Sequence, residues 1–154
     1  MKYLYILTIG LCILSCDSKK VYDDFNDLEN AFWPIDSIQN FTFQIDDTLK
    51  AYNLYATFRN SSSYPFYNIY FQYSVKDSVE NILLQELTEF NFFDPKTGEP
   101  LGSGLGDLFD HTFLLEENYR FKSPGEFSLQ FQQFMRMDTL PYIVSVGARI
   151  ESTE

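Results

Sequence analysis

The sequence predicts an all-β protein: an antiparallel β-sandwich, immunoglobulin-like or jelly-roll-like, with at most short helices. Three observations lead to this prediction. Apolar and polar residues alternate with a period of two over several stretches, as in strands with one face on a core and one in water. Turn residues separate most of these stretches, and no convincing helical stripe exceeds two turns. Sheets without long helices bury their apolar faces against each other, so a sandwich is the expected architecture.

The first 15 residues, MKYLYILTIGLCILS, have the layout of a secretory signal peptide. One lysine precedes an apolar centre at residues 4–14, which is shorter than the ~20 residues of a membrane-spanning helix. The segment is therefore expected to be removed. The sequence ILSC at residues 13–16 also fits a bacterial lipobox, in which apolar and small residues precede a cysteine that is alkylated with diacylglycerol before cleavage. Cys16 is thus the predicted lipidation site and first residue of the mature chain; an ordinary cleaved secretory signal is the alternative.

Cys12 and Cys16 are the only cysteines, and two other roles for the pair are weak. A disulfide between them would lie inside an apolar run that is embedded in the membrane during export. A zinc site normally needs four ligands, and no histidine is nearby. Lipidation instead uses the thiolate of Cys16 as a nucleophile. The mature chain then has no disulfide and must be stabilised by a packed core.

The mature chain of about 139 residues has the length of one domain, which can bury a sizeable core without a covalent staple. Loss of Lys2 with the leader leaves ten basic and twenty-two acidic residues, a formal charge of −12. This charge argues against nucleic acid as a partner and against electrostatic adhesion to anionic lipid. Membrane contact is therefore predicted to come from the lipid anchor, whose several acyl chains matter because one chain binds only marginally.

Residues 16–30, CDSKKVYDDFNDLEN, are polar and acidic and are predicted to be a tether that precedes a sandwich domain at 31–154. The predicted strands are half-buried, rich in aromatic and β-branched residues, and cover 41–45, 52–60, 66–75, 82–93, 126–135 and 142–150, with turn signals at 61–65, 94–98 and 123–125. Residues 21–32 and 107–115 could hold short helices.

Aromatic residues make up 18% of the chain, and its sixteen phenylalanines need a core to fill. We expect most of them inside the sandwich. An excess of tyrosine on an exposed face would instead mark a partner surface. The stretch YPFYNIYFQY at 64–73 is where we expect aromatic residues on both faces of a strand.

His111 is the only histidine, and it lies near Asp107 and Asp110 in the sequence GDLFDH. A His–Asp pair can act as a general base with its orienting carboxylate. No serine or cysteine nucleophile stands in a recognisable elbow, so a turn position is the simpler interpretation of His111.

Two loops resemble ligand sites only superficially. Gly102, Gly104 and Gly106 do not have the spacing of a dinucleotide fingerprint, and a tight loop or strand crossing with positive φ accounts for them. DPKTGE at 94–99 is typical of a hairpin turn, since a calcium loop needs more oxygen ligands in register. The scattered carboxylates give no support for a glycosidase pair. We therefore predict no catalytic residue, no metal site, no cofactor and no enzyme.

One tripeptide, Asp-(Ser/Thr)-aliphatic, recurs and is similar to the periplasmic O-glycosylation acceptor of Bacteroidota. Its hydroxyl residues are Ser37, Thr48, Ser78 and Thr139. Asp-Ser and Asp-Thr are also common turn and capping pairs. The hypothesis is that some of the four carry glycans; the intact mass of protein from its native host tests it, and polypeptide plus lipid alone would contradict it.

The lipobox and several ordered phrases together resemble the GldH gliding-motility lipoproteins of Bacteroidota. The phrases are VYDDFNDLENAFWPIDSIQNFTFQIDDT, YNLYATFRNSSSYPFYNIY, GSGLGDLFDHTFLL and FMRMDTLPYIVSVGARIE. The resemblance covers most of the mature chain and implies an outer-membrane lipoprotein that faces the periplasm and is needed for gliding, a process tied to type IX secretion. Cys16 is the position whose role transfers. The DSKK that follows it does not resemble the acidic surface-export signal of this phylum, which favours the periplasmic leaflet.

The expected function is a non-catalytic accessory or scaffold role, with protein partners in the gliding and type IX secretion machinery. The alternative is a carbohydrate-binding sandwich in which exposed Trp33 or tyrosines stack on sugar rings, and a third hypothesis is a hydrolase that uses Asp107, Asp110 and His111. Four arginines lie in or beside strands, where solvation or internal ion pairs are the simpler roles and partner contact the alternative: Arg59, Arg120, Arg136 and Arg149.

Overall fold

The computed structural model describes residues 19–153, which form a β-sandwich with no α-helix in that range. The predicted leader at 1–15 and the predicted lipidation site Cys16 lie outside the described residues. No helix within residues 19–153 is long and apolar enough to cross a membrane.

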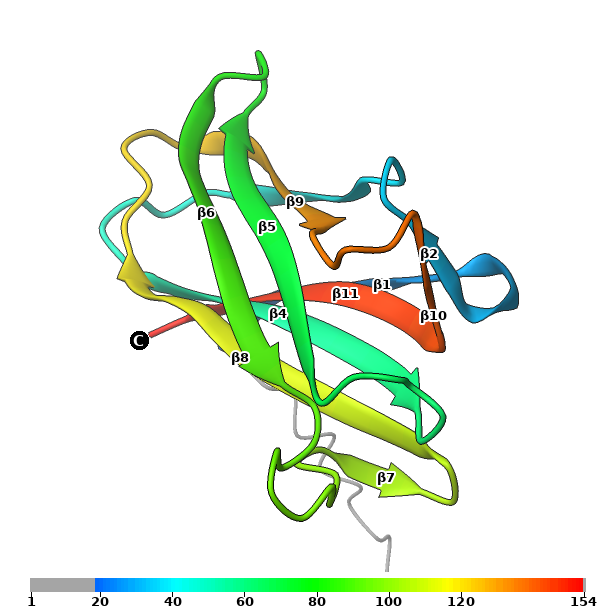
Figure 1. Cartoon of the computed structure of the whole chain (residues 1–154). Helices are drawn as coiled ribbons and strands as arrows, with labels where there is room; N and C mark the ends of the chain where they lie inside the picture. Colours follow the sequence, from blue (N-terminus) through cyan, green and yellow to red (C-terminus); the bar gives the residue numbers. More distant parts are fainter. Residues whose placement is uncertain (1–18, 154) are drawn as a thin grey trace, which may run out of the picture.

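Two antiparallel sheets face each other, and their strands cross at a steep angle (Figure 1). The first sheet has the order β1-β11-β4-β8-β7, with β1 Lys20–Asp27, β11 Ile143–Ser152, β4 Tyr52–Ser61, β8 Leu108–Tyr119 and β7 Ser103–Leu105. The second has the order β3-β9-β5-β6, with β3 Gln39–Ile45, β9 Gly125–Gln133, β5 Asn68–Asp77 and β6 Ile82–Asn91. A short pair, β2 Phe32–Pro34 and β10 Thr139–Pro141, lies beside them. The predicted fold class is confirmed.

Aromatic side chains from both sheets fill the space between the layers. Strand β3 alternates strictly, so that Phe41, Phe43 and Ile45 are buried while the residues between them are exposed. Phe58 of β4 meets Phe71 of the opposite sheet edge to face, with ring centroids 5.1 Å apart. Most phenylalanines lie in the interior, as the composition predicts, and their rings pack in the tilted geometries that aromatic pairs prefer.

The interpretation of 16–30 as a tether is wrong from Lys20 onward. Residues 20–27 form strand β1, which pairs with β11 in the register Asp23↔Arg149 and Phe25↔Gly147. Its sequence looks like a linker because β1 is an edge strand with mostly exposed side chains. Tyr22 faces inward and packs on Phe43, with ring centroids 5.9 Å apart, so the sandwich begins at Lys20 rather than at residue 31.

Both segments that could hold short helices are mainly strand. Residues 21–32 contain β1 and only a 3₁₀ turn at Glu29–Ala31, and 107–115 enters β8. The long strand β8 was missed because a pair of neighbouring leucines and a pair of glutamates break its alternation, and its pairing with β4 shifts register near Leu54. Residues 66–67 and 134–135 lie just outside β5 and β9, which the predicted ranges had included.

The predicted hairpin turn at 94–98 is confirmed. Asp94 Oδ1 accepts hydrogen bonds from the backbone N–H groups of Lys96 and Thr97, both at 2.8 Å. Gly98 closes the turn with a φ of +72°, a conformation that favours glycine.

Candidate functional site

His111 lies on the inner face of β8, not in a turn as the sequence suggested. Its side chain is buried, and its ring stacks on Phe92 with a centroid distance of 4.5 Å. Phe113 lies two residues farther along the same face of β8. Its ring stacks on both His111 and Phe92, with centroid distances of 5.7 and 6.0 Å. Because successive strand residues point to opposite faces, Asp110 points outward. The sequence neighbours His111 and Asp110 therefore do not form a base and its orienting carboxylate.

The electrostatics of His111 agree with a core residue. Burial lowers its pKa to about 4, although Asp110 acts in the opposite direction, so the imidazole is neutral at pH 7. Its Nε2 atom has no hydrogen-bond partner among residues 19–153. A neutral ring stacked on two phenylalanines contributes to core packing, and the hydrolase hypothesis loses its proposed base.

Asp110 forms a surface ion pair instead. Arg59 Nε and Nη2 donate to its two carboxylate oxygens at 2.6 and 3.0 Å, a bidentate arrangement. Arg59 holds the pKa of the Asp110 carboxyl below its usual range. The pair borders a shallow cavity of about 300 Å³ on the outer face of the first sheet. Arg149 also lines this cavity, and its guanidinium forms an ion pair with Glu151. Arg59 and Arg149 thus form ion pairs within the protein, as the simpler of the two predicted roles requires.

The three glycines of LGSGLGD are structural. A Cβ atom on Gly102 would lie 2.4 Å from the Asp110 carbonyl oxygen, and one on Gly104 would lie 2.1 Å from that of Leu108. Gly106 has a φ of +72° at the tip of the β7–β8 hairpin. Close strand approach and a positive φ thus explain the motif, which confirms the prediction of a tight loop or strand crossing.

Trp33 is fully buried, and its indole Nε1–H donates to the Ser37 carbonyl oxygen at 2.7 Å. It packs on Phe58 inside the core. The prediction that an exposed Trp33 could stack on a sugar ring is therefore wrong.

The four candidate glycosylation residues differ in accessibility. Ser78 and Thr139 are exposed, whereas Ser37 and Thr48 are half-buried. In two of the tripeptides the aspartate closes a turn: Asp47 Oδ1 accepts the Leu49 N–H at 2.9 Å, and Asp77 Oδ1 accepts the Val79 N–H at 3.0 Å. Both readings of the motif are compatible with this geometry, and glycosylation stays a prediction.

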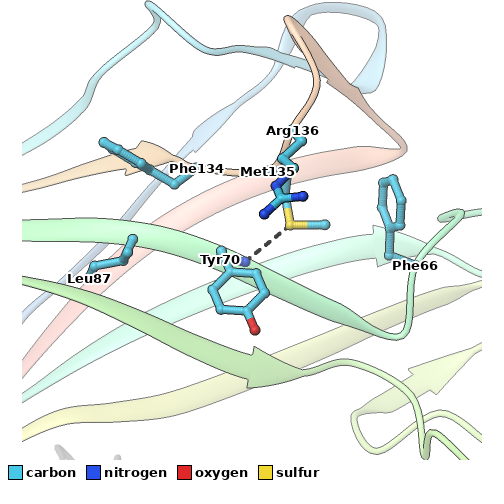
Figure 2. A pocket seen from close by; sticks show the side chains of 6 residues that line it. All are labelled: Phe66, Tyr70, Leu87, Phe134, Met135 and Arg136. Atoms are coloured by element: carbon cyan, nitrogen blue, oxygen red, sulfur yellow. Dashed lines mark hydrogen bonds between the residues drawn. The ribbon is translucent and has the colours of Figure 1, made fainter.

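A cavity lined by aromatic and aliphatic side chains lies on the outer face of the second sheet (Figure 2). It measures about 430 Å³ and is lined by Phe66, Tyr70, Leu87, Phe134, Met135 and Arg136. Figure 2 shows these side chains converging from β5, β6 and the segment after β9, with the Arg136 guanidinium above the Tyr70 ring. We call it the Tyr70 pocket. The aromatic stretch at 64–73 does place rings on both faces, since Tyr70 is exposed and Phe71 is buried.

Backbone contacts fix the shape of the Tyr70 pocket. The Tyr70 N–H donates to Met135 Sδ at 3.2 Å, and the Phe134 N–H donates to the Tyr70 carbonyl oxygen at 2.8 Å. These bonds hold the chain after β9 against β5. Leu87, Phe134 and Tyr70 nevertheless keep 58%, 43% and 39% of their surface exposed. The pocket is thus a preformed, half-apolar recess rather than a closed core.

Polar groups flank the Tyr70 pocket on one side. Glu89 accepts a hydrogen bond from Asn68 Nδ2 at 2.6 Å, and its interaction with the Tyr70 hydroxyl raises the pKa of Tyr70 and lowers that of Glu89. Arg136 forms no hydrogen bond or ion pair with residues 19–153, in contrast to the other three arginines of the chain. A bound molecule can therefore meet a carboxylate, a hydroxyl and a guanidinium beside aromatic rings.

A row of amide side chains extends from the Tyr70 pocket along the outer face of the second sheet. The row contains Asn40, Gln44, Gln72, Gln85, Gln130 and Gln132. Gln130 Nε2 donates to Asn40 Oδ1 at 3.0 Å, and a cavity of about 140 Å³ lies between Gln72, Gln85 and Gln130. Sequence reasoning missed this surface because its parts are far apart along the chain. The alternation of glutamines with buried residues in β9 is the signal that could have found it.

Comparison with known proteins identifies the family. The family model described as GldH lipoprotein matches residues 20–150. The chain belongs to the GldH lipoprotein family. A GldH homolog named as a gliding motility lipoprotein, from Christiangramia forsetii, is 31% identical over 99% of this chain and 95% of its own length. The gliding motility lipoprotein GldH of Flavobacterium johnsoniae is 26% identical over 97% and 95%.

The resemblance inferred from the sequence is thereby confirmed, and both GldH relatives are named as motility lipoproteins rather than as enzymes. Among solved structures, the VP2 subviral particle of infectious bursal disease virus gives a TM-score of 0.44 at 12% identity, covering 95% of this chain and 37% of that chain. The VP2 of the Gx strain gives 0.38 at 12% identity, over 95% and 36%. This chain thus spans little more than a third of these viral proteins, and scores of this size carry no functional argument.

Proposed function

We propose that the mature protein is a lipoprotein of the outer membrane, anchored through Cys16, that faces the periplasm and is required for gliding motility. It acts there as a non-catalytic accessory or scaffold protein linked to type IX secretion. The observation that carries the proposal is the match over nearly the full length to two gliding motility lipoproteins. The lipobox at 13–16 supports the anchor, and DSKK after Cys16 supports the periplasmic leaflet.

The arrangement of the sandwich supports a scaffold role. The one histidine is neutral and packed against aromatic rings, and Asp110 is held by Arg59 on the opposite face. By contrast, the Tyr70 pocket presents exposed aromatic rings and an arginine without an ion pair, which are the residue types that dominate protein interfaces. The proposed partner surface is this pocket.

The test is genetic. Deletion in the native host should abolish colony spreading and reduce secretion of type IX cargo; wild-type chain should restore both, whereas Cys16→Ala should not. The Cys16→Ala chain should leave the membrane fraction or accumulate unprocessed. In intact cells the wild-type chain should resist added protease until the outer membrane is opened. A null strain that spreads normally, or unchanged lipid labelling of the Cys16→Ala chain, contradicts the proposal.

A second candidate, carbohydrate binding, is favoured by one observation: the Tyr70 pocket continues into the amide row. Aromatic faces stack on sugar rings, and amides offer both a donor and an acceptor to hydroxyl groups. Soluble oligosaccharides and cell-wall glycan fragments, titrated by calorimetry, should then bind the wild-type domain, and Tyr70→Ala or Phe134→Ala should abolish binding. Phe25→Ala, an exposed ring on the other sheet, is the matched control. If no glycan produces a heat of binding, the carbohydrate-binding function is contradicted and a protein partner remains the proposed ligand of the pocket.

A further inference from the structure

One end of the sandwich gathers segments from all parts of the chain. It comprises residues 19–20, 46–51, 76–83, 120–124 and 152–153, which we call the anchor end. Loop 46–51 and loop 120–124 lie on the same side as the C-terminus in Figure 1, and Arg120 Nη1 donates to the Leu49 carbonyl oxygen at 2.9 Å. The Thr153 N–H donates to the Ala51 carbonyl oxygen at 3.0 Å, and the Ser152 N–H donates to that of Lys19 at 2.7 Å.

The base of the β5–β6 hairpin adjoins this end, and the hairpin tip projects beyond it (Figure 1). Strand β5 finishes beside the start of β9, with Asp77 paired to Phe127. A cavity of about 150 Å³ is lined by Asp77 and Leu83 of this hairpin together with Arg120 and Lys122. The base of the hairpin therefore adjoins loop 120–124.

Aliphatic side chains stand exposed at the tips of the anchor end. Leu49 is 87% exposed and Val79 is 73% exposed, and Ile82 and Leu83 beside Val79 are about half exposed. Each tip is held by an aspartate two residues earlier, which accepts the N–H of Leu49 or Val79. The turn thus holds the aliphatic side chain in a solvent-exposed position.

The charge of the anchor end is opposite to that of the rest of the protein. The segments contain Lys19, Lys20, Lys50, Lys76, Arg120 and Lys122, which are six of the ten basic residues of the mature chain. With four acidic residues, these segments carry a formal charge of +2, against −14 for the remainder of the mature chain. Lys50, Arg120 and Lys122 form no ion pair with residues 19–153.

The chain length before β1 places this end close to the proposed anchor. Lys19 is three positions after Cys16, and at no more than ~3.6 Å per position the two residues are at most about 11 Å apart. If Cys16 carries the lipid, Lys19 cannot be farther than that from the headgroup region. The exposed tips and free cations thus lie on the end that the anchor holds beside the bilayer.

We propose that the anchor end docks on the membrane leaflet that holds the lipid, with Leu49 and the Val79 hairpin entering the headgroup region and Lys50, Arg120 and Lys122 meeting lipid phosphates. The inference rests on the proposed lipidation of Cys16. Cations near an anionic surface and buried aliphatic groups each add to membrane affinity. The strongly acidic remainder then points away from the leaflet, and the Tyr70 pocket stays open to the periplasm.

The opposite end provides the control. Leu105 at the β7–β8 hairpin is 94% exposed, yet its neighbours are acidic Glu99, Asp107 and Asp110. Apolar exposure alone is therefore common to both ends, whereas six of the ten basic residues of the mature chain lie in the anchor end.

The first experiment measures orientation in vesicles of phosphatidylethanolamine and phosphatidylglycerol that contain the lipidated chain. Ser123→Cys places a fluorophore in the anchor end, and Ser103→Cys places the same fluorophore on exposed β7; the thioether-linked Cys16 does not react. Nitroxide-labelled lipids should quench the probe at 123 several-fold more than the probe at 103. Equal quenching at both positions, with the lipid confirmed by intact mass, overturns docking and leaves the anchor intact. Absence of the lipid in the mass refutes the anchor itself.

The second experiment removes the anchor. The Cys16→Ala chain, exported with an ordinary cleavable signal, should float weakly with phosphatidylglycerol vesicles, and Lys50→Glu should reduce binding at least about fivefold. Leu49→Asp should also reduce it, whereas Leu105→Asp should not, with circular dichroism confirming the fold of each variant. Equal loss in the Leu49 and Leu105 variants contradicts the proposal. So does a glycan on Thr48 or Ser78 in native protein, because it would hold the tip off the bilayer.

Discussion

At His111, one step along a strand separates an ionic surface from an apolar core. The carboxylate of Asp110 pairs with Arg59 in solvent, while the side chain of His111 stacks on Phe92 and Phe113 in the core. Proximity in sequence suggested a His–Asp pair, and the alternation of strand faces prevents it. Burial then lowers the pKa of His111 to about 4, so its protonation opposes folding.

This shift predicts a pH-dependent stability. The folded pKa of His111 lies below the ordinary value of about 6.5, so the unfolded state binds the proton first as the pH falls. Stability is unaffected above pH 7 and should drop by about 2 to 3 kcal/mol between pH 6.5 and 4.5. In His111→Phe this contribution disappears, while the carboxylates titrate as before. Urea unfolding of both chains at pH 7 and 4.5 measures the difference; an identical pH effect in the two would contradict it.

Among the elements, β1 changes how the start of the domain is understood. It is an edge strand whose exposed acidic residues look like a linker, but Tyr22 packs on Phe43 and its backbone completes the ladder of β11. Strands such as β3 could be predicted because four buried residues alternate with three exposed ones. An edge strand with mostly exposed side chains gives no such pattern. Strand β1 can therefore be recognised only from its pairing with β11.

Truncation distinguishes a strand from a tether. A chain that begins at residue 28 lacks β1 and should lose more than about 3 kcal/mol of stability, because the packing of Tyr22 and the β1–β11 hydrogen bonds are removed. A chain that begins at residue 19 is the control and should unfold like the full mature protein. Urea unfolding followed by near-ultraviolet circular dichroism gives both values. Equal midpoints for the two truncations would restore the tether interpretation.

For the whole molecule, the sequence was sufficient for class and family but not for surfaces. The phrases that match the family, the turn at Asp94 and the phenylalanine core were all predictable, since each depends on local pattern or composition. The Tyr70 pocket was not, because Leu87 and Arg136 reach it from strands and loops that only the sheet order brings together. The charge asymmetry of the anchor end has the same origin: net charge is visible in a sequence, but its placement requires the fold.

The position of β1 also determines how the protein bears mechanical load. Lys19 is bonded to Ser152 through its carbonyl oxygen, and the ladder from Lys20 to Asp27 runs antiparallel beside β11. A pull on the chain from residue 19 along the axis of β1 therefore acts on the successive hydrogen bonds of this ladder together, in shear, rather than opening them one at a time. A free tether would pass the force to the domain at a single point. If Cys16 carries the proposed lipid, this edge strand spreads the load from the anchor over the whole β1–β11 ladder.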